Sequence, residues 1–336
     1  MAANKAGQPS RIRDVATRAG VSSATVSRVL AGKPHVSAEV RARVLEAVET
    51  LRYRPNRIAR SLRVQRSRFI GLVVSDIQNP FFSRVVRAVE DAVQPHGFAV
   101  FVCNTDENRE REQLYLELLL DEQVAGIILA PTVADAASYQ PFTATRIPLV
   151  IVDRQVMGLG VDIVVSNNFE AAREVVTQLI GQGHRRIGTI LSDLTIATGR
   201  ERFAGYQRAL TEAGLPLDEG LARFGKPVAE EGYRLAQQLL THAEPPSALF
   251  AGSKLLAMGV LRYLAEAKLR IPEDVALASF DALDWLPSMP EILCVEQPAY
   301  DIGQQAALLL LRRIDKPERP AETLVLASRL ERIGQP

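Results

Sequence analysis

The sequence has 336 residues, of which 47% are apolar and 24% charged, with a formal net charge of +1; this is typical of a globular protein with about two or three domains. It contains no run of the roughly 18 apolar residues that a membrane span requires, and no apolar run after the polar start at 1–10 that would indicate a signal peptide. The two cysteines, Cys103 and Cys294, lie in apolar segments. We therefore exclude a membrane-spanning or disulfide-rich protein and expect a cytoplasmic protein with buried thiols.

The charge is distributed unevenly along the chain. Residues 1–68 contain 15 Lys or Arg and 4 Asp or Glu, whereas the remaining residues contain 25 and 35. A basic segment of net +11 therefore precedes an acidic body of net −10. This asymmetry predicts that the first segment binds a polyanion. A disordered basic tail is the alternative, but the segment has a strong helical periodicity.

Apolar residues recur at helical spacing three times in the basic segment. They are Ile12, Val15, Ala16 and Ala19, then Val26, Val29 and Leu30, then Val40, Val44, Val48 and Leu51. Gly20 provides a helix stop, and Ser22 and Ser37 are placed to cap the second and third helices. Two short helices around a tight turn, supported by a third, predict a helix-turn-helix domain over residues 10–54.

The second predicted helix has the features of a helix that reads DNA. It exposes Ser23, Ala24, Ser27 and Arg28. Small side chains at its start allow the backbone to approach the major groove, and Arg28 can donate two hydrogen bonds to a guanine edge.

A fourth basic helix is predicted at 55–67, where Pro55 can begin it and arginines recur at three-residue spacing. Such a short, arginine-rich helix is marginal in water but would be stabilised against phosphates. Leu62 is a candidate wedge between base steps in the minor groove. The alternative is a solvated linker helix.

Beyond residue 68, apolar runs alternate with amphipathic helical stretches twice over, which predicts two α/β lobes with parallel sheets. The sequence lacks the glycine-rich dinucleotide motif, the phosphate-binding loop, the zinc-protease motif and the nucleophile elbow. Its four histidines are scattered, and His184 is interpreted as a structural loop residue. We therefore expect no catalytic residues, no metal and no cofactor, and a ligand sensor rather than an enzyme.

The chain contains IRDVATRAGVSSATVSRVLAGKPHVS followed by YRPNRIARSL, and then IGLVVSDIQNPFFSRVVRAVE, IPLVIVDR, GHRRIG, IPEDVALASFD and EQPAYDIG in this order. In these segments it resembles the LacI/GalR family of bacterial repressors, whose DNA-binding head is similar to the first two. The resemblance implies an all-α head at 10–54, a hinge helix and linker at 55–67, and a two-lobed effector and dimerisation domain like periplasmic sugar-binding proteins at 68–336. The implied first lobe is 68–166 plus 298–322, and the second is 167–297 plus 323–332.

The resemblance also implies which residues contact DNA. They are Ser22, Ser23, Ala24, Thr25, Ser27 and Arg28 of the reading helix, His35 and Tyr53 beside it, and Asn56, Ala59 and Leu62 of the hinge. Arg11 departs from the family, which usually has a threonine cap there, and Ser10 is the substitute cap that we expect.

By position in the family, one set of residues borders the effector. It comprises Phe81, Phe82, Arg154, Arg202, Lys226, Ser253, Lys254, Asp281 and Gln297. Relatives commonly have acids near Lys226 and Lys254, so two acids have become two lysines. Cations in a closing cleft require an anion, because unpaired buried charges are costly. The sequence therefore favours an acidic effector such as gluconate or 2-ketogluconate, with sugar phosphates second and a neutral sugar as the alternative.

These inferences combine into one hypothesis of function. We expect a homodimeric repressor of carbohydrate or sugar-acid metabolism that binds a near-palindromic operator and is released by a small anionic metabolite. A dimer rather than a tetramer is expected because no leucine heptads follow the last apolar run. The alternatives are a regulator that its ligand activates as a corepressor, or one that depends on a phosphocarrier protein.

Overall fold

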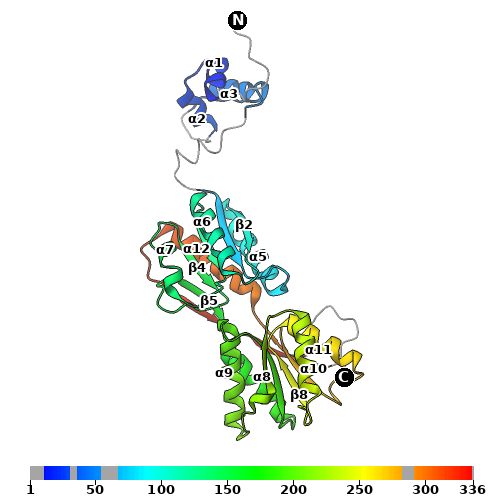
Figure 1. Cartoon of the computed structure of the whole chain (residues 1–336). Helices are drawn as coiled ribbons and strands as arrows, with labels where there is room; N and C mark the ends of the chain where they lie inside the picture. Colours follow the sequence, from blue (N-terminus) through cyan, green and yellow to red (C-terminus); the bar gives the residue numbers. More distant parts are fainter. Residues whose placement is uncertain (1–10, 31–35, 54–66, 282–290, 335–336) are drawn as a thin grey trace. The chain divides into compact units, whose positions relative to one another are not determined.

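The computed structural model describes residues 11–30, 36–53, 67–281 and 291–334. The chain divides into two compact units, Met1–Arg66 and Ser67–Pro336, which we describe in turn (Figure 1). No helix of the described residues is long and apolar enough to cross a lipid bilayer.

The first unit contains α1 (Ile12–Ala19), α2 (Ser23–Leu30) and α3 (Ala38–Thr50). Gly20 ends α1 in the left-handed conformation with φ 65°, which glycine adopts without a steric penalty. Ser22 and Ser37 accept hydrogen bonds from the backbone N–H groups of Thr25 and Val40, so both predicted caps are confirmed. At the start of α1 the cap position is Arg11 and not the expected Ser10, which lies outside the described residues; the Arg11 N–H donates to Asp14.

The predicted apolar stripes of the three helices form one small core. Val15, Val26 and Val44 are fully buried at its centre, and the remaining predicted positions are buried or pack against them. Tyr53, which the resemblance implies to contact DNA, is partly buried against this same core.

The first lobe of the second unit is built on a six-stranded sheet in the order β11-β5-β4-β3-β1-β2. Its strands are β1 (Phe69–Val74), β2 (Ala99–Asn104), β3 (Gly126–Leu129), β4 (Leu149–Val152), β5 (Asp162–Ser166) and β11 (Thr323–Leu326). All neighbouring strands are parallel, and β3, β4 and β5 are buried along their whole length. Near-continuous apolar sequence is typical of strands covered on both faces.

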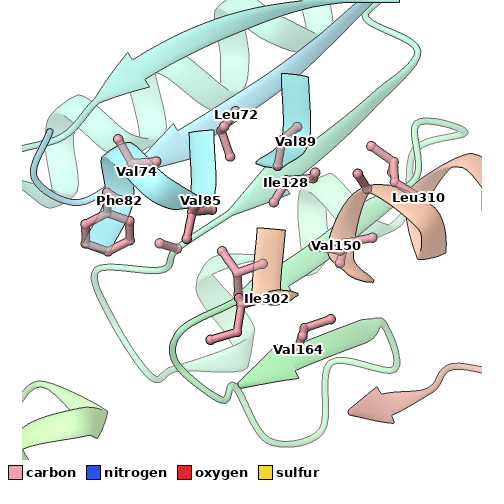
Figure 2. Packing of buried hydrophobic residues seen from close by; sticks show 14 of the residues in the cluster. Leu72, Val74, Phe82, Val85, Val89, Ile128, Val150, Val164, Ile302 and Leu310 are labelled. Atoms are coloured by element: carbon pink, nitrogen blue, oxygen red, sulfur yellow. The ribbon is translucent and has the colours of Figure 1, made fainter. Parts of the chain in front are cut away.

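Helices cover the two faces of this sheet. On one face α5 (Pro80–Val93) packs beside α12 (Ala299–Asp315), and their apolar side chains meet those of the strands (Figure 2). The second apolar cluster of the lobe includes side chains of α6 (Arg109–Asp121) and α7 (Gln140–Thr143). The short 3₁₀ turns η1 (Gln94–His96) and η2 (Ala136–Ser138) complete the lobe.

The second lobe repeats this architecture with the strand order β12-β10-β9-β8-β6-β7. Its strands are β6 (Ile187–Ser192), β7 (Ala222–Gly225), β8 (Ala248–Ala251), β9 (Ala276–Phe280), β10 (Ile292–Glu296) and the antiparallel β12 (Arg329–Ile333). The helix pairs are α8 (Asn168–Gly181) with α9 (Ala197–Glu212), and α10 (Ala229–Leu240) with α11 (Lys254–Glu266). The turn η3 (Glu219–Leu221) precedes β7.

The chain passes between the two sheets three times, after β5, after β10 and after β11. The third passage corrects one predicted boundary, because 323–326 was assigned to the second lobe. The strand β11 instead pairs with β5 of the first sheet, and only β12 joins the second. The residues of β11 alternate between exposed and partly buried, as in an edge strand. This pattern fits the edge of either sheet, so the sequence does not indicate which of the two sheets β11 joins.

Candidate functional site

The helix α2 presents the side chains that the sequence predicts to contact DNA. Ser22, Ala24 and Arg28 are exposed, and Ser23, Thr25 and Ser27 are partly exposed. Val26 and Val29 point the opposite face of the helix into the core. His35, Asn56, Ala59 and Leu62 lie outside the described residues.

A polar cavity in the second unit is lined by residues of both lobes. The first lobe contributes Ser75, Asp76, Glu107, Asp153 and Arg154, together with Phe81 and Phe82 at the start of α5. The second contributes Ser192, Thr198, Arg202, Ser253 and Asp281, and Gln297 lies on a passage between the sheets. Ser75, Asp153, Asp281 and Gln297 directly follow the strands β1, β4, β9 and β10, so the cavity lies at the carboxyl ends of the strands, where open α/β sheets bind ligands.

Arg154 is a buried guanidinium whose charge is neutralised within the first lobe. Its two terminal nitrogens donate to the two carboxylate oxygens of Glu107, one of them over 2.7 Å. They also donate to the Pro131 carbonyl over 2.9 Å and to Ser75 over 3.4 Å. Its Nε lies 3.2 Å from the Asp153 carboxylate. Both terminal nitrogens of Arg154 are therefore hydrogen-bonded by groups of the first lobe, whereas its buried Nε makes no hydrogen bond to the described residues.

Arg202 is a second buried guanidinium, but its hydrogen bonds go to neutral acceptors. It donates to Asn168 Oδ1 over 2.9 and 2.8 Å, to the Gly252 carbonyl over 2.5 Å and to Gln297 Oε1 over 3.0 Å. Its planar group also stacks 3.8 Å above the ring centroid of Phe280. A guanidinium positioned this firmly can orient a ligand oxygen without moving.

Asp153 and Asp281 occupy equivalent places in the two lobes. Each directly follows a buried strand, β4 or β9, and each has a positive φ, 67° and 64°. Burial raises the pKa of both carboxyls above the ordinary value, and the Arg202 charge opposes the shift in both. Strained backbone that carries buried acids is concentrated at functional sites, which favours a binding role for this pair.

Hydrogen bonds connect the cavity to the passages between the sheets. Gln297 donates to both carboxylate oxygens of Asp281 over 3.0 Å and accepts from Ser166 over 3.0 Å. Asn168, at the start of α8, donates to Glu201 and accepts from Arg202. Because these residues lie where the chain crosses between lobes, a ligand at Arg202 or Asp281 is positioned to affect the geometry of the crossing.

Seven of the nine residues predicted to bind the effector line this cavity, and the two lysines are not among its described lining residues. They are Phe81, Phe82, Arg154, Arg202, Ser253, Asp281 and Gln297. Lys226 is exposed in the loop before α10, and Lys254 is a buried first residue of α11. The prediction of an acidic effector depended mainly on these two lysines, and the described lining of the cavity contains neither of them.

Sequence reasoning did not select Glu107, Asp153 and Asn168, which hold the two guanidiniums. Each carries a carboxylate or amide close after a strand, and that placement was the available signal. Among the described residues, no group of three or more His, Cys, Asp or Glu is arranged to hold a metal ion.

Two family models match the chain. One, for bacterial regulatory proteins of the lacI family, matches residues 11–56, and the other, for periplasmic binding proteins and the sugar-binding domain of the LacI family, matches residues 67–330. The chain is 35% identical to the probable HTH-type transcriptional regulator EndR of Paenibacillus polymyxa, over 93% of both chains. It is 36% identical to the ribose operon repressor of Halalkalibacterium halodurans, over 93% of this chain and 92% of that one.

A solved structure extends the similarity to three dimensions. The chain matches a lac repressor dimer bound to operator and the anti-inducer ONPF with a TM-score of 0.86 and 26% identity, over 97% of this chain and 98% of the other. The similarity confirms the predicted fold class of a helix-turn-helix head and a two-lobed α/β domain. The relatives are transcriptional regulators and not enzymes, which is the outcome that the sequence predicts.

Proposed function

Because the chain belongs to the LacI family of bacterial regulatory proteins, we propose that it represses transcription as a homodimer that a small, neutral, polyhydroxylated ligand releases from its operator. The observation that carries the ligand class is the charge of the cavity. Its described lining residues include four carboxylates, Asp76, Glu107, Asp153 and Asp281, and two guanidiniums, Arg154 and Arg202.

This arrangement favours a ligand rich in hydroxyl groups. A carboxylate accepts hydroxyl hydrogens, and a guanidinium donates to hydroxyl oxygens, so the mixed lining can satisfy a polyol on several sides. Burial raises the pKa of Asp76, Asp153 and Asp281, and a further negative charge beside them would be repulsive. Phe81 and Phe82 add apolar surface for the carbon skeleton.

A sugar acid is the second candidate, and one observation supports it. The hydrogen bonds that Arg202 makes to the described residues all go to neutral acceptors, so none of these residues offers its charge a hydrogen-bonded carboxylate. A ligand carboxylate at Arg202 would form charge-assisted bonds but would approach Asp153 and Asp281.

Titration calorimetry with matched sugar pairs tests the ligand class. The probes are D-ribose, D-glucose and cellobiose, each beside its aldonic acid. We expect at least one neutral sugar to bind about ten times or more tightly than its acid, because a disfavoured charge costs about 1.4 kcal/mol or more. Tighter binding of the acids, or no binding of any of the six compounds, would contradict the proposed ligand class.

The DNA-binding part of the proposal depends on α2 and on the hinge. We expect Leu62→Ala, in the hinge outside the described residues, to weaken operator binding while leaving sugar binding unchanged. By the family resemblance Leu62 is the wedge that opens a base step, and the resulting bend repays a few kcal/mol of unstacking. Fluorescence anisotropy on duplexes selected from a random library measures the effect. An operator affinity equal to that of the wild type would refute this role of Leu62.

The dimer is supported by apolar side chains on the first lobe. Phe101 and Val102 lie on the edge strand β2, and Leu114 and Leu118 lie one turn apart on α6; all four are between 40% and 51% exposed. An open apolar strand edge is a template for pairing with another chain, and we propose that a second copy covers it. We expect sedimentation equilibrium to give the mass of two chains. A mass of one or of four chains at micromolar concentration would overturn this assembly.

A further inference from the structure

In the cavity, the terminal nitrogens of Arg154 are hydrogen-bonded to protein groups and are therefore not available to an anionic ligand. Both terminal nitrogens of the guanidinium donate to the carboxylate of Glu107, in the parallel two-bond geometry that a ligand carboxylate would otherwise take. The second hydrogen of each nitrogen is directed to Pro131 or Ser75. The remaining donor, Nε, makes no hydrogen bond to the described residues but is buried 3.2 Å from the Asp153 carboxylate, so an anion that reached it would meet a like charge.

Glu107 is held in this position by its own loop. It has a φ of 56°, and its N–H donates to the Ser75 carbonyl over 3.2 Å, so the loop between β2 and α6 is fixed to the end of β1. The next residue, Asn108, caps α6 through the N–H of Arg111 over 2.8 Å. The carboxylate is therefore a fixed part of the cavity wall rather than a mobile side chain that a ligand could displace.

We propose that Glu107 determines the charge selectivity of the cavity, by occupying the face of Arg154 that would bind a ligand carboxylate. This inference rests on the proposed function and assigns its selectivity to one residue. Removing the negative charge of Glu107 makes the net charge of the lining one unit more positive. It also leaves the terminal nitrogens of Arg154 without their carboxylate partner, so that they can pair with a carboxylate of the ligand. The cavity should then accept sugar acids, while the groups that bind hydroxyls stay in place.

The test is calorimetric titration of Glu107→Gln, in the full chain, with D-ribose, D-glucose and cellobiose and their aldonic acids. We expect the affinity for the acids, relative to that for the matched neutral sugars, to rise about tenfold or more. The matched control is Glu110→Gln, which removes the same charge from an exposed position in the first turn of α6, three residues after Glu107 and not among the described lining residues, and should change neither affinity.

A second variant tests whether the loss of the Glu107 charge, rather than a change in the shape of the cavity, causes the rise in acid affinity. Glu107→Gln combined with Arg154→Gln removes one charge of each sign, so its acid affinity should return to within about threefold of the wild-type value. If Glu107→Gln does not fold, Glu107→Asp replaces it. That variant keeps the charge but is too short to bridge both nitrogens, and should raise acid affinity about threefold.

Two outcomes overturn the inference, and they can be told apart. If the wild type prefers neutral sugars and Glu107→Gln keeps the same preference, the role of Glu107 is wrong while the proposed ligand class stands. If the wild type already binds the acids more tightly, or binds none of the six compounds, the proposed ligand class is wrong and the inference fails with it.

Discussion

Replacing Arg202 with alanine should abolish measurable sugar binding and lower the free energy of unfolding by about 3–5 kcal/mol. The guanidinium satisfies Asn168, Gln297 and the Gly252 carbonyl at once, and it is the positive charge that most lowers the pKa of Asp281. Without it, buried acceptors lose their donor and a buried carboxylate loses its counter-charge. Either loss alone is costly because Arg202, Asn168 and Gln297 are buried.

The pH dependence of this variant provides a second signature. Burial raises the pKa of Asp281 and Arg202 opposes the rise, so the pKa should be higher still in Arg202→Ala. The folded variant then binds a proton more readily than the unfolded chain. Lowering the pH from about 7 to about 5 should therefore restore part of its lost stability, since a protonated Asp281 needs no counter-charge.

Urea denaturation and calorimetry measure both effects, with Arg200→Ala as the matched control. Arg200 lies on the same helix but is exposed, and its hydrogen bonds go to the Leu194 and Thr195 carbonyls. We expect less than about 1 kcal/mol for that variant and unchanged sugar affinity. If Arg202→Ala binds sugars like the wild type, the cavity is not the ligand site.

The second large effect concerns Arg313, at the end of α12, which secures the sheet of the first lobe. Its guanidinium donates to both carboxylate oxygens of Asp162 over 3.0 and 2.8 Å, and Asp162 is fully buried at the start of β5. Asp162 also accepts the N–H of Glu322 over 2.9 Å, directly before β11. We expect Arg313→Met to cost about 3–5 kcal/mol, because it leaves a buried carboxylate unpaired.

A double variant decides whether that cost comes from the unpaired charge. Asp162→Asn combined with Arg313→Met should be more stable than Arg313→Met alone, since the double variant no longer buries a charge. Arg312→Met, at the exposed neighbouring position, should cost less than about 0.5 kcal/mol. If the double variant is less stable than the single one, packing of the arginine stem and not its charge explains the loss.

The sequence predicted most of the fold because local signals agreed with the final structure. The helical spacing of Val15, Val26 and Val44 identified the core of the first unit, and Ser22 and Ser37 are caps as expected. The buried strands of the second unit were recognisable as apolar runs that parallel sheets require. The strand β11 was assigned to the wrong lobe because nothing local distinguishes one sheet edge from the other.

The site was predicted less completely because charge pairing is not local. Arg154 and Glu107 are 47 positions apart in sequence and come together only through the strand order β4-β3-β1-β2. From its position in the sequence alone, Arg154 was therefore interpreted as a cation that can bind an acidic ligand. Lys254 was placed correctly at the junction of β8 and α11, but a position at a strand end does not establish which way a side chain points. Pairing across the sheet changed the favoured ligand from an acid to a neutral sugar.

We propose that a neutral sugar in this cavity controls DNA binding. The decisive measurement is a titration of a selected operator duplex with the wild-type chain, in the absence and in the presence of the neutral sugar with the highest affinity. The sugar is supplied at about 100 times its dissociation constant. We expect it to lower operator affinity about tenfold or more, within a typical coupling of about 1–3 kcal/mol. An operator affinity that the bound sugar leaves unchanged, or increases, would contradict this proposal.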